Sequence, residues 1–270
     1  MKETLEIDGL TRTFTVVEPE KPRDLLLFFH GSLQSGSVMR RFTDGTFDEL
    51  ARRTGCVLIY PDGVDRHFND YRRQLPVKAR ELGVDDIAFT RALVSLAQRR
   101  YGTQRTFACG YSNGGQMVLR LLFDAPGLLH AACVFASTLG EGDNHAPSNP
   151  DSAYRPTPLM FMHGTADPYA PYEGGVAGLD PQRTRGRVTS ALWTAKHMAQ
   201  LNGAAAEPVL ARPYPDVEVR TWEGENPVEF WTMLGAGHVI PSGKELDPRI
   251  GPNTDSFLAA DVVGRFFGLR

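Results

Sequence analysis

A serine in this chain lies in a pattern that can present it as a nucleophile. Ser112 stands in the motif GYSNG at 110–114, between the apolar run Phe107–Cys109 and the helix-like run Gln116–Phe123. G-x-S-x-G between a strand and a helix is typical of a tight turn that exposes a serine hydroxyl at the end of a sheet. The pattern is short and also arises by chance in glycine-rich turns, so its interpretation depends on the partners that the rest of the chain supplies.

A serine hydroxyl needs a base within hydrogen-bond distance, and the base needs an acid that orients it. In the order typical of such turns, the acid and then a histidine follow the serine. Asp167 comes shortly after the apolar run Leu159–Met162, and His238 shortly after the run Phe230–Leu234, each in a glycine-containing turn. We therefore predict Ser112 as nucleophile, Asp167 as orienting acid and His238 as base. The alternatives are an Asx-turn for the aspartate and a structural role for the histidine.

The same chemistry requires backbone N–H groups that bind the oxyanion of the tetrahedral intermediate. One donor is expected from Asn113, the residue after the serine, and one from the loop after the apolar run Leu25–Phe29. In that loop, FFHGSLQSG, Ser32 is the first choice and Leu33 the second. Leu33 and several aromatic residues near the motifs are further candidates for the substrate pocket, although core or rim packing is the common role of such side chains: Phe68, Tyr71, Tyr111, Tyr169 and Tyr172.

The elements that position these residues are predicted to form an α/β fold. Continuous apolar runs suit strands buried on both faces of a parallel sheet. The first two expected strands alternate around Asp8-Gly9, which predicts an antiparallel hairpin at the start of the sheet. The expected strands are Thr4–Ile7, Arg12–Val17, Leu25–Phe29, Val57–Tyr60, Phe107–Cys109, Ala132–Ala136, Leu159–Met162 and Phe230–Leu234.

Helical periodicity between these runs predicts helices on both faces of a mostly parallel central sheet, in a single domain over 1–270. The stripes begin near Asp85, Gln116, Val188 and Ala259. Two loops, 141–158 and 168–187, follow strands and are rich in polar residues, proline or glycine. Because ligands bind at the carboxyl edge of such sheets, these loops are expected to shape an entrance, with plain solvent loops as the alternative.

Composition excludes several classes of protein. The 270 residues are 41% hydrophobic and 23% charged, with a net charge of −3, as in ordinary globular domains. Scattered Arg pairs do not make a nucleic-acid stripe, and no apolar run is long enough for a membrane helix. Cys56, Cys109 and Cys133 lie in or beside apolar runs without metal-ligand spacing. They predict buried free thiols, and with the missing signal peptide they suggest a cytoplasmic location; the oligomeric state stays open.

Several motifs in order carry a family resemblance: HGSLQSG, YPDGV, FND, VDDIAFTRALV, GYSNGG, HGTADPYAPY and GAGH. Together they resemble the polyhydroxybutyrate depolymerase/feruloyl esterase-like branch of the α/β-hydrolases, over nearly the whole chain. The resemblance implies an α/β-hydrolase fold that acts on carboxylic esters without a cofactor, with Ser112, Asp167 and His238 as its triad. Many such relatives carry a tryptophan where this chain has Phe68, together with extra cysteines and a polymer-binding module. Their absence favours a small ester or short oligomer over a polymer.

Three other functions remain as alternatives. A peptidase of the prolyl oligopeptidase type uses the same order of triad residues, although this chain has no room for a large propeller-like domain. A non-catalytic binding protein of the same fold usually lacks one member of the triad. A nucleotide-binding protein with GYSNGG as its phosphate loop is disfavoured, because the motif lacks the P-loop lysine and the spacing of a dinucleotide fingerprint.

Overall fold

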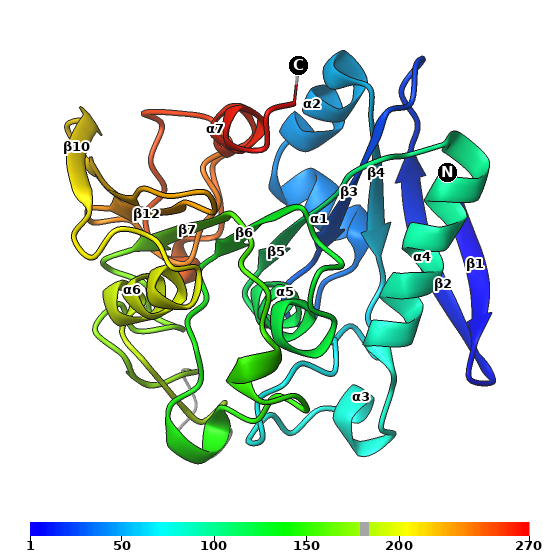
Figure 1. Ribbon diagram of the computed structural model, residues 1–270, viewed down its shortest axis with the longest axis horizontal. Helices are drawn as coiled ribbons and strands as arrows, with labels where there is room; N and C mark the ends of the chain where they lie inside the picture. The colour runs from blue at the N-terminus through cyan, green and yellow to red at the C-terminus, as the bar shows by residue number, and fades with distance from the viewer. Residues whose placement is uncertain (179–183, 270) are drawn as a thin grey trace.

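Ten strands form one sheet in the computed structural model, which describes residues 1–178 and 184–269 (Figure 1). Their order across the sheet is β1-β2-β4-β3-β5-β6-β7-β12-β11-β10. The strands are β1 (Lys2–Ile7), β2 (Leu10–Val17), β3 (Asp24–Phe29), β4 (Cys56–Pro61), β5 (Thr106–Tyr111), β6 (Ala131–Phe135), β7 (Leu159–Gly164), β10 (Val209–Tyr214), β11 (Val217–Trp222) and β12 (Val228–Met233). Two short strands, β8 (Gly175–Val176) and β9 (Arg187–Val188), pair with each other outside this sheet.

The centre of the sheet is parallel from β4 through β12, and both ends are antiparallel. The predicted N-terminal hairpin is confirmed as β1–β2. The second hairpin, β10–β11, was not predicted. β10 forms one of the two edges of the sheet, is exposed along nearly its whole length, contains Pro213 and has a register shift between Ala211 and Tyr214. Such a strand lacks the burial pattern by which strands are recognised from sequence.

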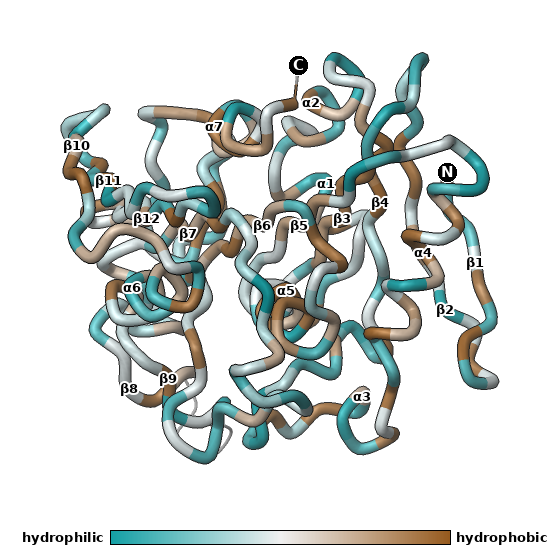
Figure 2. Tube along the Cα trace, viewed as in Figure 1, coloured by the Kyte–Doolittle hydropathy of each residue, from teal (hydrophilic) through white to brown (hydrophobic). Residues whose placement is uncertain are grey.

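Helices cover both faces of the sheet (Figure 1). In β3, Leu25 and Leu27 pack in one apolar cluster with residues of α4, α5 and α6, whereas Leu26 and Phe28 pack in the other with residues of α1, α2 and α7. Figure 2 shows hydrophobic stretches along the inner strands and hydrophilic ones in the outer loops. The helices are α1 (Gly36–Phe42), α2 (Thr46–Thr54), α3 (Lys78–Glu81), α4 (Asp86–Tyr101), α5 (Asn113–Asp124), α6 (Ala191–Leu201) and α7 (Ala259–Phe266).

Capping residues fix the ends of the long helices. The side chain of Asp85 accepts a hydrogen bond from the backbone N–H of Ala88 and begins α4, and Gly102 ends it at a φ of 68°. Ser190 caps α6 in the same way through the N–H of Trp193. A polar oxygen at an N-cap satisfies one of the free donors of the first turn. Helix α4 agrees with its predicted stripe, whereas α6 begins at Ala191, because Val188, the predicted start of its stripe, lies in β9.

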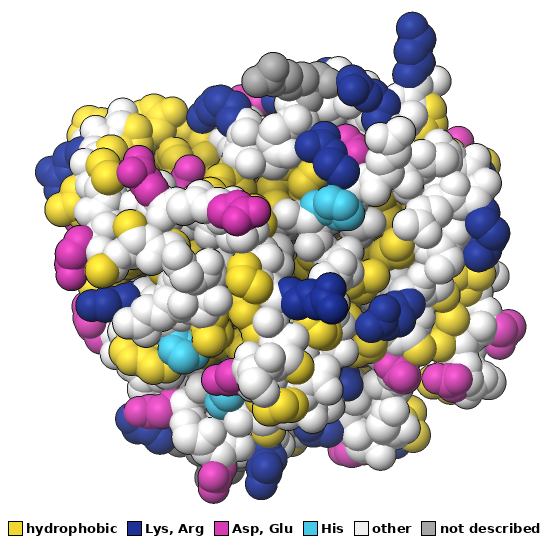
Figure 3. All heavy atoms as spheres, in the orientation of Figure 1, with side chains coloured by type: hydrophobic (Ala, Val, Ile, Leu, Met, Phe, Trp, Pro, Cys, Tyr) yellow, Lys and Arg dark blue, Asp and Glu magenta, His cyan; other side chains and the backbone are white. Residues whose placement is uncertain are grey.

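The surface and the cysteines agree with an ordinary globular chain. On the face drawn in Figure 3, basic and acidic side chains are interspersed, without a continuous stripe of one sign. Cys56, Cys109 and Cys133 are free and buried, as predicted. In the described ranges, no helix combines the length and the apolar character that a bilayer crossing needs.

Candidate active site

Ser112 lies in the turn between β5 and α5, with φ 54° and ψ −116°. An L-residue rarely adopts these angles, which are those of a turn position dominated by glycine. The turn is possible because its glycines carry no side chain: a Cβ on Gly110 would lie 2.2 Å from the carbonyl oxygen of Gly114, and one on Gly114 would lie 2.1 Å from that of Phe29. Only glycine fits at these two positions, because α5 passes directly over β5 and its neighbour β3.

Asp167 and His238 meet across the ends of β7 and β12. His238 Nδ1 lies 2.7 Å from Asp167 Oδ2. The other carboxylate oxygen accepts the backbone N–H groups of Tyr169 (2.8 Å) and Ala170 (2.9 Å). Burial acts to raise the pKa of Asp167, but the charge and hydrogen bond of His238 and these other partners bring it below its ordinary value. The carboxylate is therefore held ionised and fixed in orientation.

His163 braces the turn that carries Asp167. Its Nε2 donates to the carbonyl oxygen of Ala170 at 2.8 Å and lies 3.4 Å from Asp167 Oδ2. Burial lowers the pKa of His163, so the imidazole is neutral around pH 7 and holds the loop through that single N–H.

His238 is held on its other sides by backbone and aromatic contacts. The backbone N–H of His238 donates to the carbonyl oxygen of Ile250 (2.6 Å), and the backbone carbonyl oxygen of His238 accepts a hydrogen bond from the hydroxyl of Tyr111 (2.7 Å). The rings of Tyr111 and Tyr169 lie 5.0 and 5.2 Å from its imidazole, centre to centre. With Nδ1 bound to Asp167, Nε2 is the nitrogen left for a substrate or for Ser112. Ser112 and His238 line one pocket, and no hydrogen bond joins their side chains within the described ranges.

The loop after β3 distinguishes the two oxyanion candidates. The N–H of Leu33 donates to the carbonyl oxygen of Arg66 (3.0 Å), and its side chain is 61% exposed. The N–H groups of Ser32 and Asn113 have no acceptor in the described part of the chain. Leu33 is therefore already committed to the neighbouring loop, whereas Ser32 and Asn113 keep the free donors that an oxyanion requires.

His30 and the side chain of Asn113 both bond the segment that follows β4. His30 Nδ1 donates to the carbonyl oxygen of Gly31 (2.7 Å) and its Nε2 accepts the N–H of Gly63 (3.0 Å). Burial lowers the pKa of His30 to about 4, so the ring is neutral and keeps this tautomer. The amide of Asn113 bonds both the N–H of Phe68 (2.8 Å) and a carboxylate oxygen of Asp70 (2.8 Å).

The remaining pocket candidates fall in different places. Phe68 is fully buried against the rings of Phe29 and His30. Tyr111 is buried behind His238, and Tyr71 and Tyr172 bond Gly140 and Thr232 through their hydroxyls. Of the predicted lining residues, only Tyr169 lines the pocket at Ser112. Phe68 and Tyr111 thus act as packing, the alternative role noted for them in the sequence.

The pocket at Ser112 is small, about 20 Å³, and partly polar. Several of its lining residues were not predicted from the sequence, among them Arg72, Gln116, Thr138 and Arg185. Arg72 appeared only as part of a scattered basic pair, and Gln116 and Thr138 carried no motif. These four come from separate loops and from α5, and only the fold brings them together.

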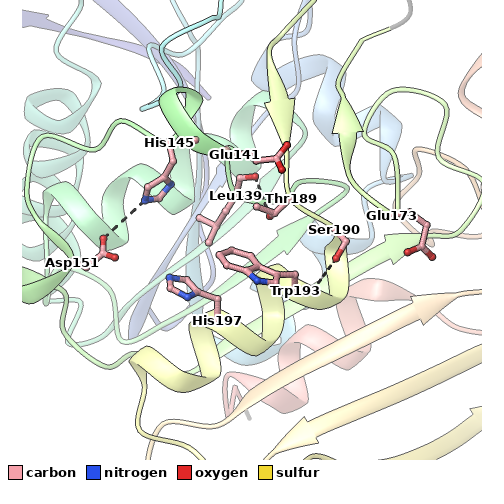
Figure 4. Close-up of a pocket in the computed structure, with 11 residues that line it drawn as sticks. Leu139, Glu141, His145, Asp151, Glu173, Thr189, Ser190, Trp193 and His197 are labelled. Atoms are coloured by element: carbon pink, nitrogen blue, oxygen red, sulfur yellow. Dashed lines mark hydrogen bonds and ion pairs between the residues drawn. The ribbon is translucent and has the colours of Figure 1, made fainter.

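Figure 4 shows a second, larger cleft of about 590 Å³. Glu141, Gly142, His145 and Asp151 come from the predicted loop 141–158, and Glu173 from 168–187; residues 179–183 of the latter lie outside the described residues. In Figure 4 the rings of Trp193 and His197 lie face to face on α6 along one side of the cleft. The full lining is Leu139, Gly140, Glu141, Gly142, His145, Asp151, Glu173, Thr189, Ser190, Trp193 and His197.

A pair of extended segments forms the wall between the two spaces. The N–H of Thr189 donates to the carbonyl oxygen of Leu139 (2.8 Å), and that of Glu141 to Arg187 (3.0 Å). Successive side chains of extended backbone point to opposite sides. Accordingly Val188 lines the small pocket and Thr189 lines the cleft. Within the described ranges, no group of three or more His, Cys, Asp or Glu side chains is placed to hold a metal ion.

Comparison with known proteins agrees with this architecture. No protein-family model matches the chain. An acetyl xylan esterase from Aspergillus awamori superposes with a TM-score of 0.70 at 15% identity, covering 100% of both chains. An alpha-beta serine hydrolase homologue from Coxiella burnetii superposes with a TM-score of 0.51 at 13% identity, covering 88% of this chain and 89% of the other. The chain has the α/β-hydrolase fold.

One curated relative also aligns in sequence. A putative esterase, NocK, of Nocardia uniformis subsp. tsuyamanensis is 29% identical over 179 residues, which is 62% of this chain and 48% of that protein. The chain thus spans about half the length of this relative. The α/β-hydrolase fold places strand ends, and the loops that follow them, around Ser112, and this is where the predicted triad residues lie.

Proposed function

We propose that this α/β-hydrolase-fold chain is a serine carboxylic-ester hydrolase that works through an acyl-enzyme. The observation that carries the proposal is the contact of 2.7 Å between Asp167 Oδ2 and His238 Nδ1, with His238 and Ser112 lining the same pocket. The name of the relative NocK, a putative esterase, supports the same reaction class.

The residues have the following roles in this mechanism. Ser112 Oγ attacks the ester carbonyl carbon while His238 Nε2 takes its proton, and Asp167 stabilises the imidazolium. The N–H groups of Ser32 and Asn113 bind the oxyanion of the tetrahedral intermediate. The carbon–oxygen bond of the ester then breaks, and the alcohol leaves with the proton from His238. Water attacks the acyl-enzyme by the same route and releases the acid.

The size of the pocket favours a short acyl group. A space of about 20 Å³ holds one or two water-sized groups, since a single water needs roughly 10–15 Å³ on this measure. An acetyl group meets this limit, whereas a feruloyl ring or a long alkyl chain exceeds it. Of the ester types that the sequence suggested, a short aliphatic ester is therefore our proposal, with the alcohol part directed away from this space.

Initial rates with 4-nitrophenyl acetate, butyrate and octanoate and with a peptide nitroanilide test the proposal. We expect turnover of the acetate, little or no turnover of the octanoate, and loss of activity in Ser112→Ala. Ser95→Ala, a serine-to-alanine change within α4, is the matched control and keeps wild-type rates. Equal rates for wild type and Ser112→Ala refute the nucleophile, and cleavage of the anilide alone identifies a peptidase. No turnover of any substrate favours a non-catalytic binding protein.

A further inference from the structure

Two arginines contribute positive charge to the wall of the pocket at Ser112. Arg72 and Arg185 line the pocket, and no Asp or Glu does so among the described residues. Asp70 is the carboxylate behind Arg72, and it is shared with Arg80, whose Nη2 lies 4.0 Å from Asp70 Oδ1. Buried charges of one sign are costly unless an opposite charge accompanies them.

Arg72 is only 3% exposed and has a donor to spare. Its Nε and Nη2 bond the two oxygens of Asp70 at 3.2 and 2.7 Å. No hydrogen bond of its Nη1 is found in the described part of the chain. A guanidinium that is fixed by one carboxylate in this way offers its remaining edge at a defined angle, as in arginine sites that recognise carboxylates.

Arg185 approaches the same region from the loop before β9. Burial lowers its pKa, and the positive charge of Arg72 lowers it further. Its backbone is held on both sides: its N–H donates to the carbonyl oxygen of Ala177 (2.9 Å), and its own carbonyl oxygen accepts Asn144 Nδ2 (3.1 Å). The two guanidinium groups therefore repel each other across a small space, and an anion placed between them relieves that repulsion.

Two buried polar side chains of this pocket also have one atom each without a partner in the described part of the chain. Thr138 is 1% exposed and its hydroxyl makes no hydrogen bond within the described ranges. Gln116, 3% exposed, donates its Nε2 to the carbonyl oxygen of Thr138 (2.8 Å), while its Oε1 is unpaired. Buried polar atoms in folded proteins nearly always have a partner. A ligand or water completes this set, and the hydroxyl of Thr138 can donate to an anion.

We propose that the pocket at Ser112 binds a carboxylate carried on a short acyl group, with Arg72, Arg185 and the hydroxyl of Thr138 as its donors. The substrate class is then a half-ester of a short dicarboxylic acid. The inference rests on the proposed ester hydrolysis and adds the charge of the acyl group. The two oxygens of a carboxylate match a space of one or two water-sized groups.

The test compares two substrates of equal size and different charge. Monoethyl malonate carries the carboxylate, and ethyl malonamate replaces it with a neutral amide. The measured quantity is the ratio of their kcat/KM values, from ethanol release. We expect Arg185→Gln to lower this ratio about tenfold, because a hydrogen bond to a charged group contributes roughly 1.5–3 kcal/mol. The matched control is Arg187→Gln. Arg187 lies two residues after Arg185, is exposed and pairs with Glu141, so its replacement is expected to leave the ratio unchanged.

A second variant protects the test from effects on folding. Thr138→Val removes a hydroxyl that has no partner, so the thermal midpoint is expected to stay or rise while the ratio falls a few-fold. An unchanged ratio in both Arg185→Gln and Thr138→Val overturns the carboxylate site.

Two further arms separate the possible failures. In 3-acetoxybenzoate and 3-acetoxybenzamide the acyl group is acetyl, and the carboxylate or amide is on the leaving phenol. A preference for the charged substrate in this pair alone would mean that the anion is recognised on the alcohol part of the ester, and this also overturns the site. Hydrolysis of ethyl malonamate that is lost in Ser112→Ala keeps the ester hydrolase even when the carboxylate preference is absent. Absence of all ester turnover refutes the proposed function itself.

Discussion

Replacing Ser112 by glycine is expected to abolish ester hydrolysis and yet to leave a protein more stable than Ser112→Ala. Both variants lose the hydroxyl. Only alanine keeps a Cβ in the conformation at φ 54° and ψ −116°, where glycine has no steric penalty. The comparison therefore isolates the backbone strain at the proposed nucleophile.

The size of the difference follows from two opposing effects. A non-glycine residue held in such a region costs of order 1–3 kcal/mol, and glycine loses about 0.5–1 kcal/mol more backbone entropy on folding than alanine. The net gain for Ser112→Gly is about 1 kcal/mol, which corresponds to a rise of roughly 2–4 °C in the thermal midpoint of a domain of this size.

Differential scanning calorimetry of the two variants, with urea unfolding as a second measurement, checks this value. Activity on 4-nitrophenyl acetate is measured in parallel and is expected to be at background in both. A thermal midpoint of Ser112→Gly equal to or below that of Ser112→Ala refutes the argument, because the turn then imposes no strain on its serine.

Further outcomes follow from the same geometry. Asp167→Asn is expected to lower kcat by about 10⁴. Because the pKa of Asp167 is lowered in the folded protein, its carboxylate stabilises the fold above the ordinary aspartate pKa, and this stabilisation is lost as pH falls through the lowered pKa. In Asp167→Asn the thermal midpoint is therefore expected to fall less steeply below about pH 4 than in the wild type. Tyr111→Phe removes the donor to the carbonyl oxygen of His238 and is expected to cost about 1–3 kcal/mol in urea unfolding, with kcat reduced and KM unchanged. Gly114→Ala places a Cβ 2.1 Å from the carbonyl oxygen of Phe29 and is expected to cost about 3 kcal/mol or more, seen as loss of soluble protein or a much lower midpoint.

Much of the fold could be predicted because its strands are buried on both faces. Runs such as Leu25–Phe29 are apolar without interruption, and the observed β3 is buried at every position. The second hairpin escaped prediction because β10 is an exposed edge. Helices α1 and α2, residues 36–54, were also missed: α1 has only seven residues, whereas α2, at nine, is amphipathic with Phe47, Leu50 and Ala51 buried, and its pattern was overlooked.

The candidate site could also be predicted from the sequence only in part. Chain order and strand ends predicted the pairing partners Asp167 and His238, since the carboxyl ends of parallel strands meet at one edge of the sheet. Arg72 and Arg185 could not be predicted, because their place in the pocket depends on long-range contacts between loops. Tyr111 shows a further limit: its position beside Ser112 is local, but the direction of its side chain, toward the backbone of His238, is set by packing.

The edge of the sheet formed by β10 affects how the protein behaves in concentrated solution. Val209 and Leu210 on β10 are 55% and 67% exposed, and an exposed apolar edge is a template for intermolecular strand pairing and aggregation. Pro213 lacks a backbone N–H, and the register shift between Ala211 and Tyr214 bends the strand. Both features interrupt the row of donors and acceptors that a second molecule would need. Replacement of Pro213 is therefore expected to make the protein precipitate at lower concentration, while its activity at Ser112 stays unchanged.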